Sequence, residues 1–425
     1  MYVVKSMTMV NRKYVDTTWD FRLSDTKRHT HCFHAYPAMM IPQVAGRLID
    51  LYGTKAKLLF DPYCGSGTSL VEASLRGIDS VGTDLNPLAR LISIAKTTFL
   101  PMKELDEVVD NFRECVFHLG FSNEDDLEVE VPTFRNIDYW FSEPIKKKLA
   151  YISQFISTIS NPNIQNFFKG CFSETIREAS WTRNGEFKLF RMTPKQIQTF
   201  NPDPYNIMEA KLTRACKGLK EFIHDVKGTP KAQVYDFNTV HEIPSDILKR
   251  ESVDIVVTSP PYGDSRTTVA YGQYSRLSLE WLGFEDAGRI DSLLMGGKQP
   301  ICTLEFQSPH LTTAIAEVVH KDEKRSRDVV SFYKDYEASI ANVASLIKPK
   351  GFACYVVGNR KVKGVVLPTD EITVDLFSAS GFIHIETIIR NIPNKRMPSR
   401  NSPTNVTGAL DDTMTKEYIV VMQKT

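Results

Sequence analysis

The sequence predicts an α/β protein whose mostly parallel sheet is interrupted by an inserted, mainly helical domain. Two short apolar runs, residues 57–60 and 253–257, have the composition of buried parallel strands, and each leads into a loop rich in glycine or proline. Between the first α/β unit and the next one lies an excess of about 130 residues, more than a simple crossover connection absorbs. One sheet that carries a long insertion satisfies both observations.

A unit of strand, loop, helix and strand is expected first along the chain. Residues 57–60 form its first strand, and residues 69–76 form a helix that ends at Gly77. Residues 79–82 then lead into a second short strand, which ends at Thr83 and Asp84. This order is typical of sheets in which a connecting helix returns the chain to a parallel neighbour.

The C-terminal part repeats this alternation of helices and strands. An amphipathic helix is expected first, then a turn at the sequence Lys-Pro-Lys-Gly, and then a strand, a helix and two further strands. In chain order these elements are residues 329–347, 348–351, 352–357, 369–378, 383–389 and 416–422. They are expected to complete the sheet.

Three stripes of apolar residues at helical spacing indicate that the insertion is helical. The stripes run over residues 105–119, 145–159 and 207–226, and we expect them to be packing faces without chemistry. The main domain is therefore assigned to residues 1–100 and 230–425, and the inserted domain to residues 101–229.

Charge is segregated within the insertion. Residues 103–143 hold twelve acids against three bases, whereas residues 177–195 hold five bases against two acids. A polyanionic partner is therefore expected to avoid the first stretch and to contact the second.

The composition is that of a globular protein from a reducing compartment. Of the 425 residues, 42% are hydrophobic and 24% are charged, so a large core is expected. Lys and Arg number 52 against 51 Asp and Glu, which excludes a polybasic protein. The seven cysteines show no CxxC spacing, and neither an N-terminal signal segment nor a membrane-spanning apolar run is evident. We expect a soluble, cytoplasmic protein.

A glycine-containing loop follows the first strand and opens the first helix. Its glycines let the backbone approach a ligand closely, and the helix N-terminus presents free N–H groups. Asp84 follows Gly65 by nineteen positions at the end of the next strand, where a carboxylate can accept hydrogen bonds from both ribose hydroxyls of a nucleoside. Asn86, and Asp236 with Phe237 after a later strand, are expected near the adenine. The loop consists of Asp61, Pro62, Tyr63, Cys64, Gly65, Ser66, Gly67 and Thr68.

A second candidate loop, Ser259-Pro260-Pro261-Tyr262, directly follows the apolar run at residues 253–257. A rigid turn at the carboxyl end of a parallel strand is where α/β sheets place reacting groups. The Pro260 carbonyl and the Ser259 hydroxyl offer two acceptors, and Tyr262 offers a flat face. These groups suit a planar base that carries an exocyclic amine.

Together, the sequences DPYCGSGT and TSPPY resemble those of the amino-methylating DNA methyltransferases of restriction–modification systems. The likeness includes HAYPA at residues 34–38, whose Tyr36 and Pro37 resemble the family motif that folds over the methionine end of the cofactor. It covers about residues 30–100 and 230–425. It implies a Rossmann-like fold with a mostly parallel seven-stranded sheet, S-adenosylmethionine as cofactor, and double-stranded DNA as substrate.

The resemblance also implies a mechanism of direct transfer. Ser259 and the Pro260 carbonyl would hold the amine of a base that is flipped out of the duplex and stacked on Tyr262. In this family, Ser before Pro-Pro is typical of enzymes that act on N4 of cytosine, whereas Asp or Asn there is typical of adenine enzymes. We therefore expect a cytosine-N4 methyltransferase that protects its site from a cognate restriction endonuclease in a prokaryotic cytoplasm.

Three base-containing stretches are candidates for DNA contact. Residues 181–191 mix bases with aromatic residues inside the insertion, residues 390–400 hold four bases and no acid, and residues 265–276 follow the catalytic turn. The insertion is the candidate target-recognition region. The basic residues expected to contact DNA are Arg183, Lys188, Arg191, Arg266, Arg276, Lys395 and Arg396.

Other functions remain open at this point: adenine-N6 methylation of DNA, guanine-N2 methylation of RNA, or a non-catalytic DNA-binding homologue. No metal is expected. The cluster of His29, His31, Cys32 and His34 lacks the paired-ligand spacing of zinc sites.

Overall fold

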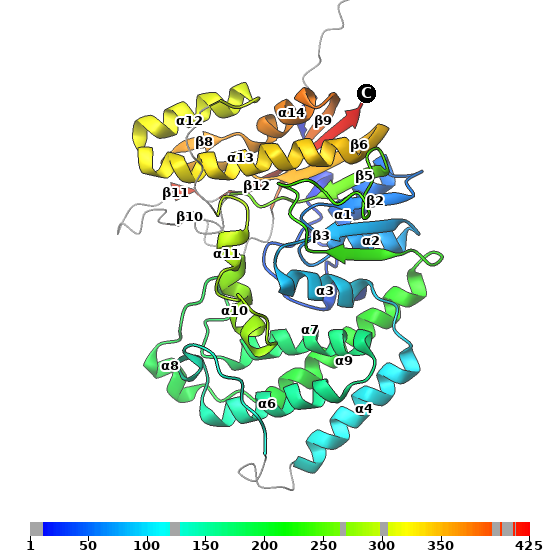
Figure 1. The fold of residues 1–425 in the computed structure, drawn as a ribbon, viewed down its shortest axis with the longest axis vertical. Coiled ribbons are helices and arrows are strands. Elements are labelled where there is room, and N and C mark those ends of the chain that lie inside the picture. Colours follow the sequence, from blue (N-terminus) through cyan, green and yellow to red (C-terminus); the bar gives the residue numbers. More distant parts are fainter. Residues whose placement is uncertain are drawn as a thin grey trace, which may run out of the picture.

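The computed structural model describes residues 12–119, 128–263, 269–297, 305–392, 400–401, 411–412 and 414–425. Within them, eight strands form one sheet in the order β1-β9-β12-β6-β5-β2-β3-β4. Figure 1 shows this sheet in the upper half of the view, above α3. Its strands are β1 (Lys13–Val15), β2 (Leu58–Asp61), β3 (Asp79–Thr83), β4 (Ala232–Tyr235), β5 (Val253–Thr258), β6 (Ile347–Val357), β9 (Phe382–Asn391) and β12 (Lys416–Lys424).

Most neighbouring strands are parallel, and β12 runs antiparallel to both β6 and β9. The two strands expected to carry the functional loops, β2 and β5, are direct parallel neighbours, with Leu59 opposite Ile255. The chain leaves β2 towards β3 on one side, whereas β5 and β6 lie on the other. Such a reversal of strand order at the carboxyl ends is where open α/β sheets bind ligands.

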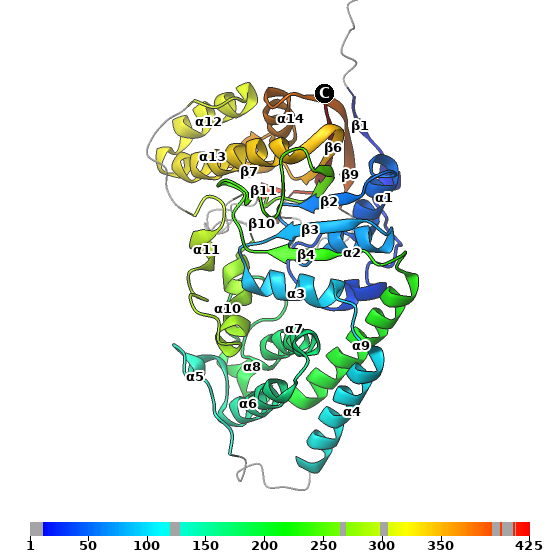
Figure 2. The same ribbon diagram turned by 45° about the vertical axis from the view of Figure 1, so that its right-hand side comes forward.

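Helices cover both faces of the sheet (Figures 1 and 2). The helices α1 (Pro42–Tyr52), α2 (Thr68–Leu75) and α3 (Pro87–Thr97) cover one face. The other face is covered by α13 (Glu323–Leu346) and α14 (Thr369–Ala379), with α12 (Pro309–Lys321) packed on both. The described part of the chain contains no helix that is both long and apolar enough to cross a membrane.

The region between α3 and β4 is helical, as the apolar stripes predict. Figure 2 shows its helices gathered at one end of the molecule, next to α3. Their apolar side chains share one core with Leu88 and Ile92 of α3 and with Trp281 of α10 (Tyr271–Trp281). The helices are α4 (Met102–Leu119), α5 (Ile137–Trp140), α6 (Glu143–Thr158), α7 (Pro162–Ala179), α8 (Pro194–Thr199) and α9 (Pro204–Asp225).

Several predicted elements need correction. The sheet has an eighth strand, because β1 adds to the edge of β9. Residues 348–351 do not form a turn that precedes a strand, since they lie within β6, where the pairing with β5 shifts register between Val253 and Ile255. The helix expected over residues 329–347 begins earlier, at Glu323, where the Asp322 side chain caps it.

Further short elements complete the described chain. The hairpin β7 (Arg360–Val362) and β8 (Val365–Leu367) follows β6, and α11 (Ile290–Leu293) follows α10. Two single-turn helices, η1 (Thr17–Trp19) and η2 (His29–Cys32), lie near the N-terminus. Near the C-terminus, β10 (Arg400–Asn401) pairs with β11 (Asp411–Asp412).

Candidate active site

A pocket lies at the carboxyl ends of β2, β3 and β5. Its volume is about 940 Å³, part of which is open to solvent. It brings together most of the residues expected at the cofactor and catalytic loops. Of those residues, its lining includes Tyr36, Pro37, Asp61, Pro62, Tyr63, Gly65, Ser66, Thr68, Asp84, Asn86, Phe237, Ser259 and Pro261. Gly67, Pro260 and Tyr262 lie in the same loops without lining it.

The glycine loop is shaped by a left-handed turn that only glycine adopts without strain. Gly67 caps α2 with a φ of 75°, and a Cβ added there would approach the Ser93 Oγ to 2.9 Å. The Ser93 hydroxyl donates a 2.7 Å hydrogen bond to the Gly65 carbonyl. The loop is therefore held against α3, and its backbone forms one wall of the pocket.

Asp84 organises the loop from the end of β3. Its Oδ2 accepts a 3.0 Å hydrogen bond from the Gly65 N–H, and its Oδ1 accepts a 2.8 Å bond from the Asn86 N–H. Each carboxylate oxygen retains acceptor capacity, so the side chain fits a pair of ribose hydroxyls. Burial raises the pKa of Asp84 to about 6, although the two N–H donors oppose this shift.

Asp61 joins the cofactor loop to the catalytic loop. The Thr258 hydroxyl, at the end of β5, donates a 2.5 Å hydrogen bond to its Oδ1, and the Ser69 hydroxyl donates to its Oδ2. Burial raises the pKa of Asp61 to about 6, against the opposing effect of these donors. The ends of β2 and β5 are thereby fixed relative to each other.

The HAYPA segment lies over the pocket through Tyr36. The Asn86 amide donates a 2.9 Å hydrogen bond to the Tyr36 hydroxyl and a 2.7 Å bond to the Ser275 hydroxyl. The Tyr36 ring stacks on Tyr271 with centroids 6.0 Å apart. Asn86 also caps α3 by accepting from the Leu88 N–H, so the cap of α3 and this segment are held together.

At the catalytic turn, two hydroxyls lie close to each other. The Ser259 Oγ lies 3.3 Å from the Tyr262 hydroxyl oxygen and donates a 3.1 Å bond to the Val356 carbonyl of β6. The Tyr262 hydroxyl donates a 3.1 Å bond to the Glu417 Oε1 of β12. Its ring passes close to Gly358, where an added Cβ would approach the ring to 2.8 Å.

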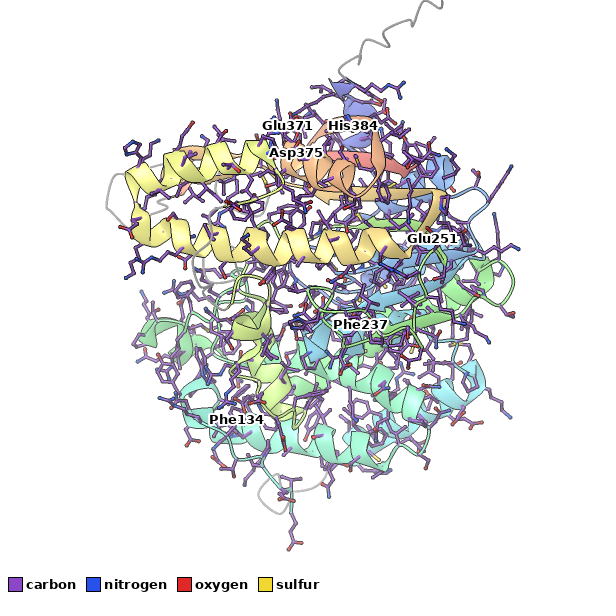
Figure 3. The ribbon with its side chains drawn as sticks, turned by 45° about the horizontal axis from the view of Figure 1, so that its top comes forward. Phe134, Phe237, Glu251, Glu371, Asp375 and His384 are labelled. Atoms are coloured by element: carbon purple, nitrogen blue, oxygen red, sulfur yellow. The ribbon has the colours of Figure 1, made fainter. Side chains whose placement is uncertain are left out.

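The two residues expected after β4 are placed differently. Phe237, labelled in Figure 3, lines the pocket and stacks against Phe60 with centroids 6.3 Å apart. The Asp236 side chain is 78% exposed, lies outside the pocket lining, and is 3.9 Å from the Arg90 guanidinium. Its contact with adenine stays a prediction.

Sequence reasoning missed part of the pocket wall. Asn238, Thr239 and Val240 follow Phe237, and Leu294 and Met295 come from the segment after α11. The Gly296 N–H donates a 2.8 Å bond to Asp335 of α13, which holds this segment in place. No motif marks these residues, since their position depends on a contact between distant parts of the chain.

The expected DNA-contacting residues are scattered. Arg183 is about half exposed and lies 3.6 Å from Glu186, whereas the Arg191 guanidinium carbon lies 4.2 Å from the Tyr139 ring centroid. Lys188 is partly exposed in the same loop. Arg276, on α10, lies 3.8 Å from Glu280. Arg266, Lys395 and Arg396 lie outside the described residues.

One expectation about the stretch at residues 390–400 is wrong. Arg390 is only 4% exposed and forms an ion pair with Glu417, its cross-strand neighbour on β12. The charge of Arg390 is satisfied inside the protein, so this residue does not offer a free cation to DNA.

The three histidines of the N-terminal cluster contact different partners. His29 contacts Asp225 at 2.8 Å, His31 contacts Glu72 at 2.9 Å, and His34 contacts the Ser173 hydroxyl at 3.0 Å. Each histidine therefore links η2 or its neighbourhood to a different helix.

Comparison with known proteins places this geometry in a family. A family model described as DNA methylase matches residues 3–94. The type II methyltransferase M.MvaI of Kocuria varians is 38% identical over 426 aligned residues, covering 95% of this chain and 93% of the relative. M.BsoBI of Geobacillus stearothermophilus is 21% identical over 332 residues, covering 72% and 62% of the two chains. Among solved structures, the rRNA methyltransferase aviRa from Streptomyces viridochromogenes is 11% identical and covers 94% of this chain and 96% of its own, with a TM-score of 0.33.

The alignment with M.MvaI includes the insertion as well as both loops, so it concerns the whole chain. It favours a DNA-methylating enzyme over the RNA and the non-catalytic alternatives. The chain belongs to the type II DNA methyltransferases of restriction–modification systems, in the group that methylates the exocyclic amine of cytosine (N4) or adenine (N6) with S-adenosylmethionine as methyl donor.

Proposed function

We propose that this enzyme methylates N4 of a cytosine flipped out of double-stranded DNA, and so protects a specific site from a cognate restriction endonuclease. The observation that carries the choice of base is Ser259 directly before Pro260-Pro261-Tyr262. Ser259 lines the pocket. In the family that the sequence resembles, serine at this position is typical of cytosine-N4 enzymes.

The catalytic turn would act mainly by positioning. The Ser259 hydroxyl and the Pro260 carbonyl accept hydrogen bonds from the amine, which keeps its N–H bonds in a fixed direction and turns the nitrogen lone pair towards the pocket. Tyr262 supplies the stacking face. When bound, S-adenosylmethionine would supply an electrophilic methyl group and leave as S-adenosylhomocysteine, and the amine would release one proton to solvent as it is methylated.

The cofactor would be held by the loop at residues 61–68 and by the residues around it. Asp84 would accept from the ribose hydroxyls, and Phe237 and Asn86 would flank the adenine. Tyr36 and Pro37 would cover the methionine end. This assignment is supported by the lining of a single pocket with a carboxylate, an aromatic face and a glycine backbone wall.

For DNA recognition, we propose the basic part of the insertion at residues 181–191. Thr182 and Arg191 form an antiparallel bridge, so this loop is a hairpin, and it carries Arg183 and Lys188. Arg191 lies over the rings of Trp181 and Tyr139, at 5.0 and 4.2 Å from their centroids. Cations beside aromatic faces suit phosphate and base contact.

Neutralising Arg183 and Lys188 together to glutamine is expected to flatten the dependence of DNA affinity on salt. Each lost phosphate contact removes about 0.9 from the slope of log K against log salt, so the pair removes roughly 2. The matched control is Lys55→Gln with Lys103→Gln, two exposed lysines of which the first precedes the amino end of β2, away from the pocket, and the second lies in the acidic stretch. An equal change of slope in both double variants would contradict the assignment.

The methylated nucleoside that the enzyme produces identifies the base on which it acts. The purified enzyme is incubated with S-adenosylmethionine and unmethylated genomic DNA, the DNA is digested to nucleosides, and these are separated by mass spectrometry. N4-methylcytosine is the expected product. N6-methyladenine would keep the family and the positioning chemistry and overturn the choice of cytosine.

A further inference from the structure

An ion pair beside the catalytic turn has no role in the chemistry described so far. Arg390 on β9 and Glu417 on β12 face each other across the two strands, and the Arg390 Nη1 donates to the Glu417 Oε2. The Arg390 Nε donates a 2.9 Å bond to the Trp19 carbonyl, so the guanidinium is also held by the N-terminal segment. The Glu417 side chain is only 18% exposed, and its other oxygen faces Tyr262.

The Tyr262 hydroxyl has a single proton, and two oxygens of the described residues lie within its reach. The Glu417 Oε1 lies at 3.1 Å and the Ser259 Oγ at 3.3 Å. Burial, and then the nearby charge of Glu417, raise the pKa of Tyr262 well above its usual range, so the hydroxyl keeps its proton. A carboxylate can only accept, whereas a serine oxygen can do either, so the proton points to Glu417.

The proton of the Ser259 hydroxyl also has an acceptor other than Tyr262. It is donated over 3.1 Å to the Val356 carbonyl, which is also an acceptor only. Among the described residues, both protons of this hydroxyl pair therefore point away from the Ser259 oxygen. The Ser259 oxygen then keeps its capacity to accept a hydrogen bond, and Ser259 lines the pocket.

We propose that Glu417, held by Arg390, is a positioning residue that takes the Tyr262 proton and thereby keeps Ser259 a pure acceptor for the amine of the target base. The inference rests on the proposed amine transfer at Ser259. It applies to cytosine and adenine alike, because both present an exocyclic NH₂ group whose hydrogens must find acceptors. Without Glu417, the Tyr262 hydroxyl would donate to Ser259 and compete with the substrate.

The test is Glu417→Gln, made in the natural enzyme and in Tyr262→Phe. Glutamine has one carbonyl oxygen. This oxygen accepts the hydrogen bond from Arg390, because a guanidinium can only donate. The amide NH₂ then faces the Tyr262 oxygen and turns its proton to Ser259. Turnover of DNA methylation is expected to fall about tenfold, with KM for S-adenosylmethionine changed less than about twofold.

Tyr262→Phe keeps the ring but has no proton to redirect. Adding Glu417→Gln to it is therefore expected to cost less than about twofold in turnover, and this non-additivity is the signature of the proposal. A loss of equal size in both backgrounds would overturn it, because a merely structural role of Glu417 does not depend on the Tyr262 hydroxyl. Unchanged turnover in Glu417→Gln alone would also overturn it.

The chain offers a matched control in Glu386 on β9, which accepts a 2.7 Å hydrogen bond from Tyr14 and another from Tyr52, away from the pocket. Glu386→Gln is expected to leave turnover unchanged. If Glu417→Gln does not fold, Glu417→Met with Arg390→Met removes both charges and tests the same non-additivity, since a buried ion pair is often replaced by apolar residues at little cost. Absence of DNA methylation in the unmodified enzyme would instead overturn the proposed function, and this inference with it.

Discussion

The two loops of the active site are built from different kinds of contact. In the cofactor loop, Ser69 donates to Asp61 and Gly65 donates to Asp84, over eight and nineteen positions along the chain, and one further bond to Asp61 comes from Thr258 on β5. In the catalytic turn, Ser259 and Tyr262 are held by residues 97 and 155 positions away, on β6 and β12. The first loop is held mainly by residues close to it in the sequence, whereas the second depends on the completed sheet.

This difference predicts how each loop fails. In the first loop, Asp84 accepts hydrogen bonds from two backbone N–H groups and is expected to bind the cofactor. Removal of its carboxylate should therefore lower the affinity for the cofactor. A turn held by distant strands should lose the geometry of the reacting groups while the cofactor still binds. Variants in the two loops are therefore expected to separate binding from turnover, and the following changes are ordered from the largest effect.

Asp84→Ala is expected to have the largest effect, on cofactor affinity. Two hydrogen bonds from ribose hydroxyls to a carboxylate contribute on the order of 3 kcal/mol together, so the Kd for S-adenosylmethionine should rise about 100-fold. Isothermal titration calorimetry measures it. An unchanged Kd would refute the ribose role and erase the contrast between the loops.

The raised pKa of Asp84, about 6, adds a pH signature. At a pH above this value, the carboxylate is ionised and accepts hydrogen bonds from both ribose hydroxyls. As the pH falls through about 6, the carboxylate is protonated, and cofactor affinity should fall by up to tenfold per pH unit. Asp84→Asn should bind weakly at every pH, without this dependence. Since Asp61 has a similar pKa and remains in that variant, a persistent pH dependence would assign the titration to Asp61 instead.

Ser259→Ala should have the smaller effect, and on turnover. It removes one acceptor of the amine, worth about 1 to 3 kcal/mol, so turnover should fall about 10-fold to 100-fold while the cofactor Kd stays within about twofold. Steady-state methylation and calorimetry on the same preparation give both values. Equal losses in turnover and in cofactor affinity would mean that the two loops act as one unit, through the bond from Thr258 to Asp61.

The same contrast explains what the sequence could predict. The strand, loop and helix around Gly65 follow from short-range pattern, and the structure confirms them. Asp84 lines the same pocket as this loop, and its contact with the ribose stays a prediction. Glu417 and Val356 could not be foreseen, because only strand pairing brings them to the catalytic turn. Arg390 was expected in an exposed basic stretch for the same reason: its partner lies on another strand.

The helices show a similar division. The stripes at residues 105–119, 145–159 and 207–226 correspond to α4, α6 and α9, each with one buried face. Helix α7 was missed, although it is as amphipathic as α9 and its buried Ile164, Phe168 and Phe172 recur at helical spacing. The role of residues 101–229 in recognising DNA, and the limits of that domain, stay predictions.

The shared core of the insertion and α3 has a consequence for the proposed role of the insertion in recognising DNA. Phe167 and Phe172 of α7 pack in the same apolar cluster as Leu88 and Ile92 of α3, and α3 is capped by the residue that holds Tyr36 over the cofactor pocket. The insertion is thus no detachable module. A graft of residues 101–229 from a relative with another specificity would have to bring along a matching α3, or the chimaera would lose cofactor binding before its new specificity could be read.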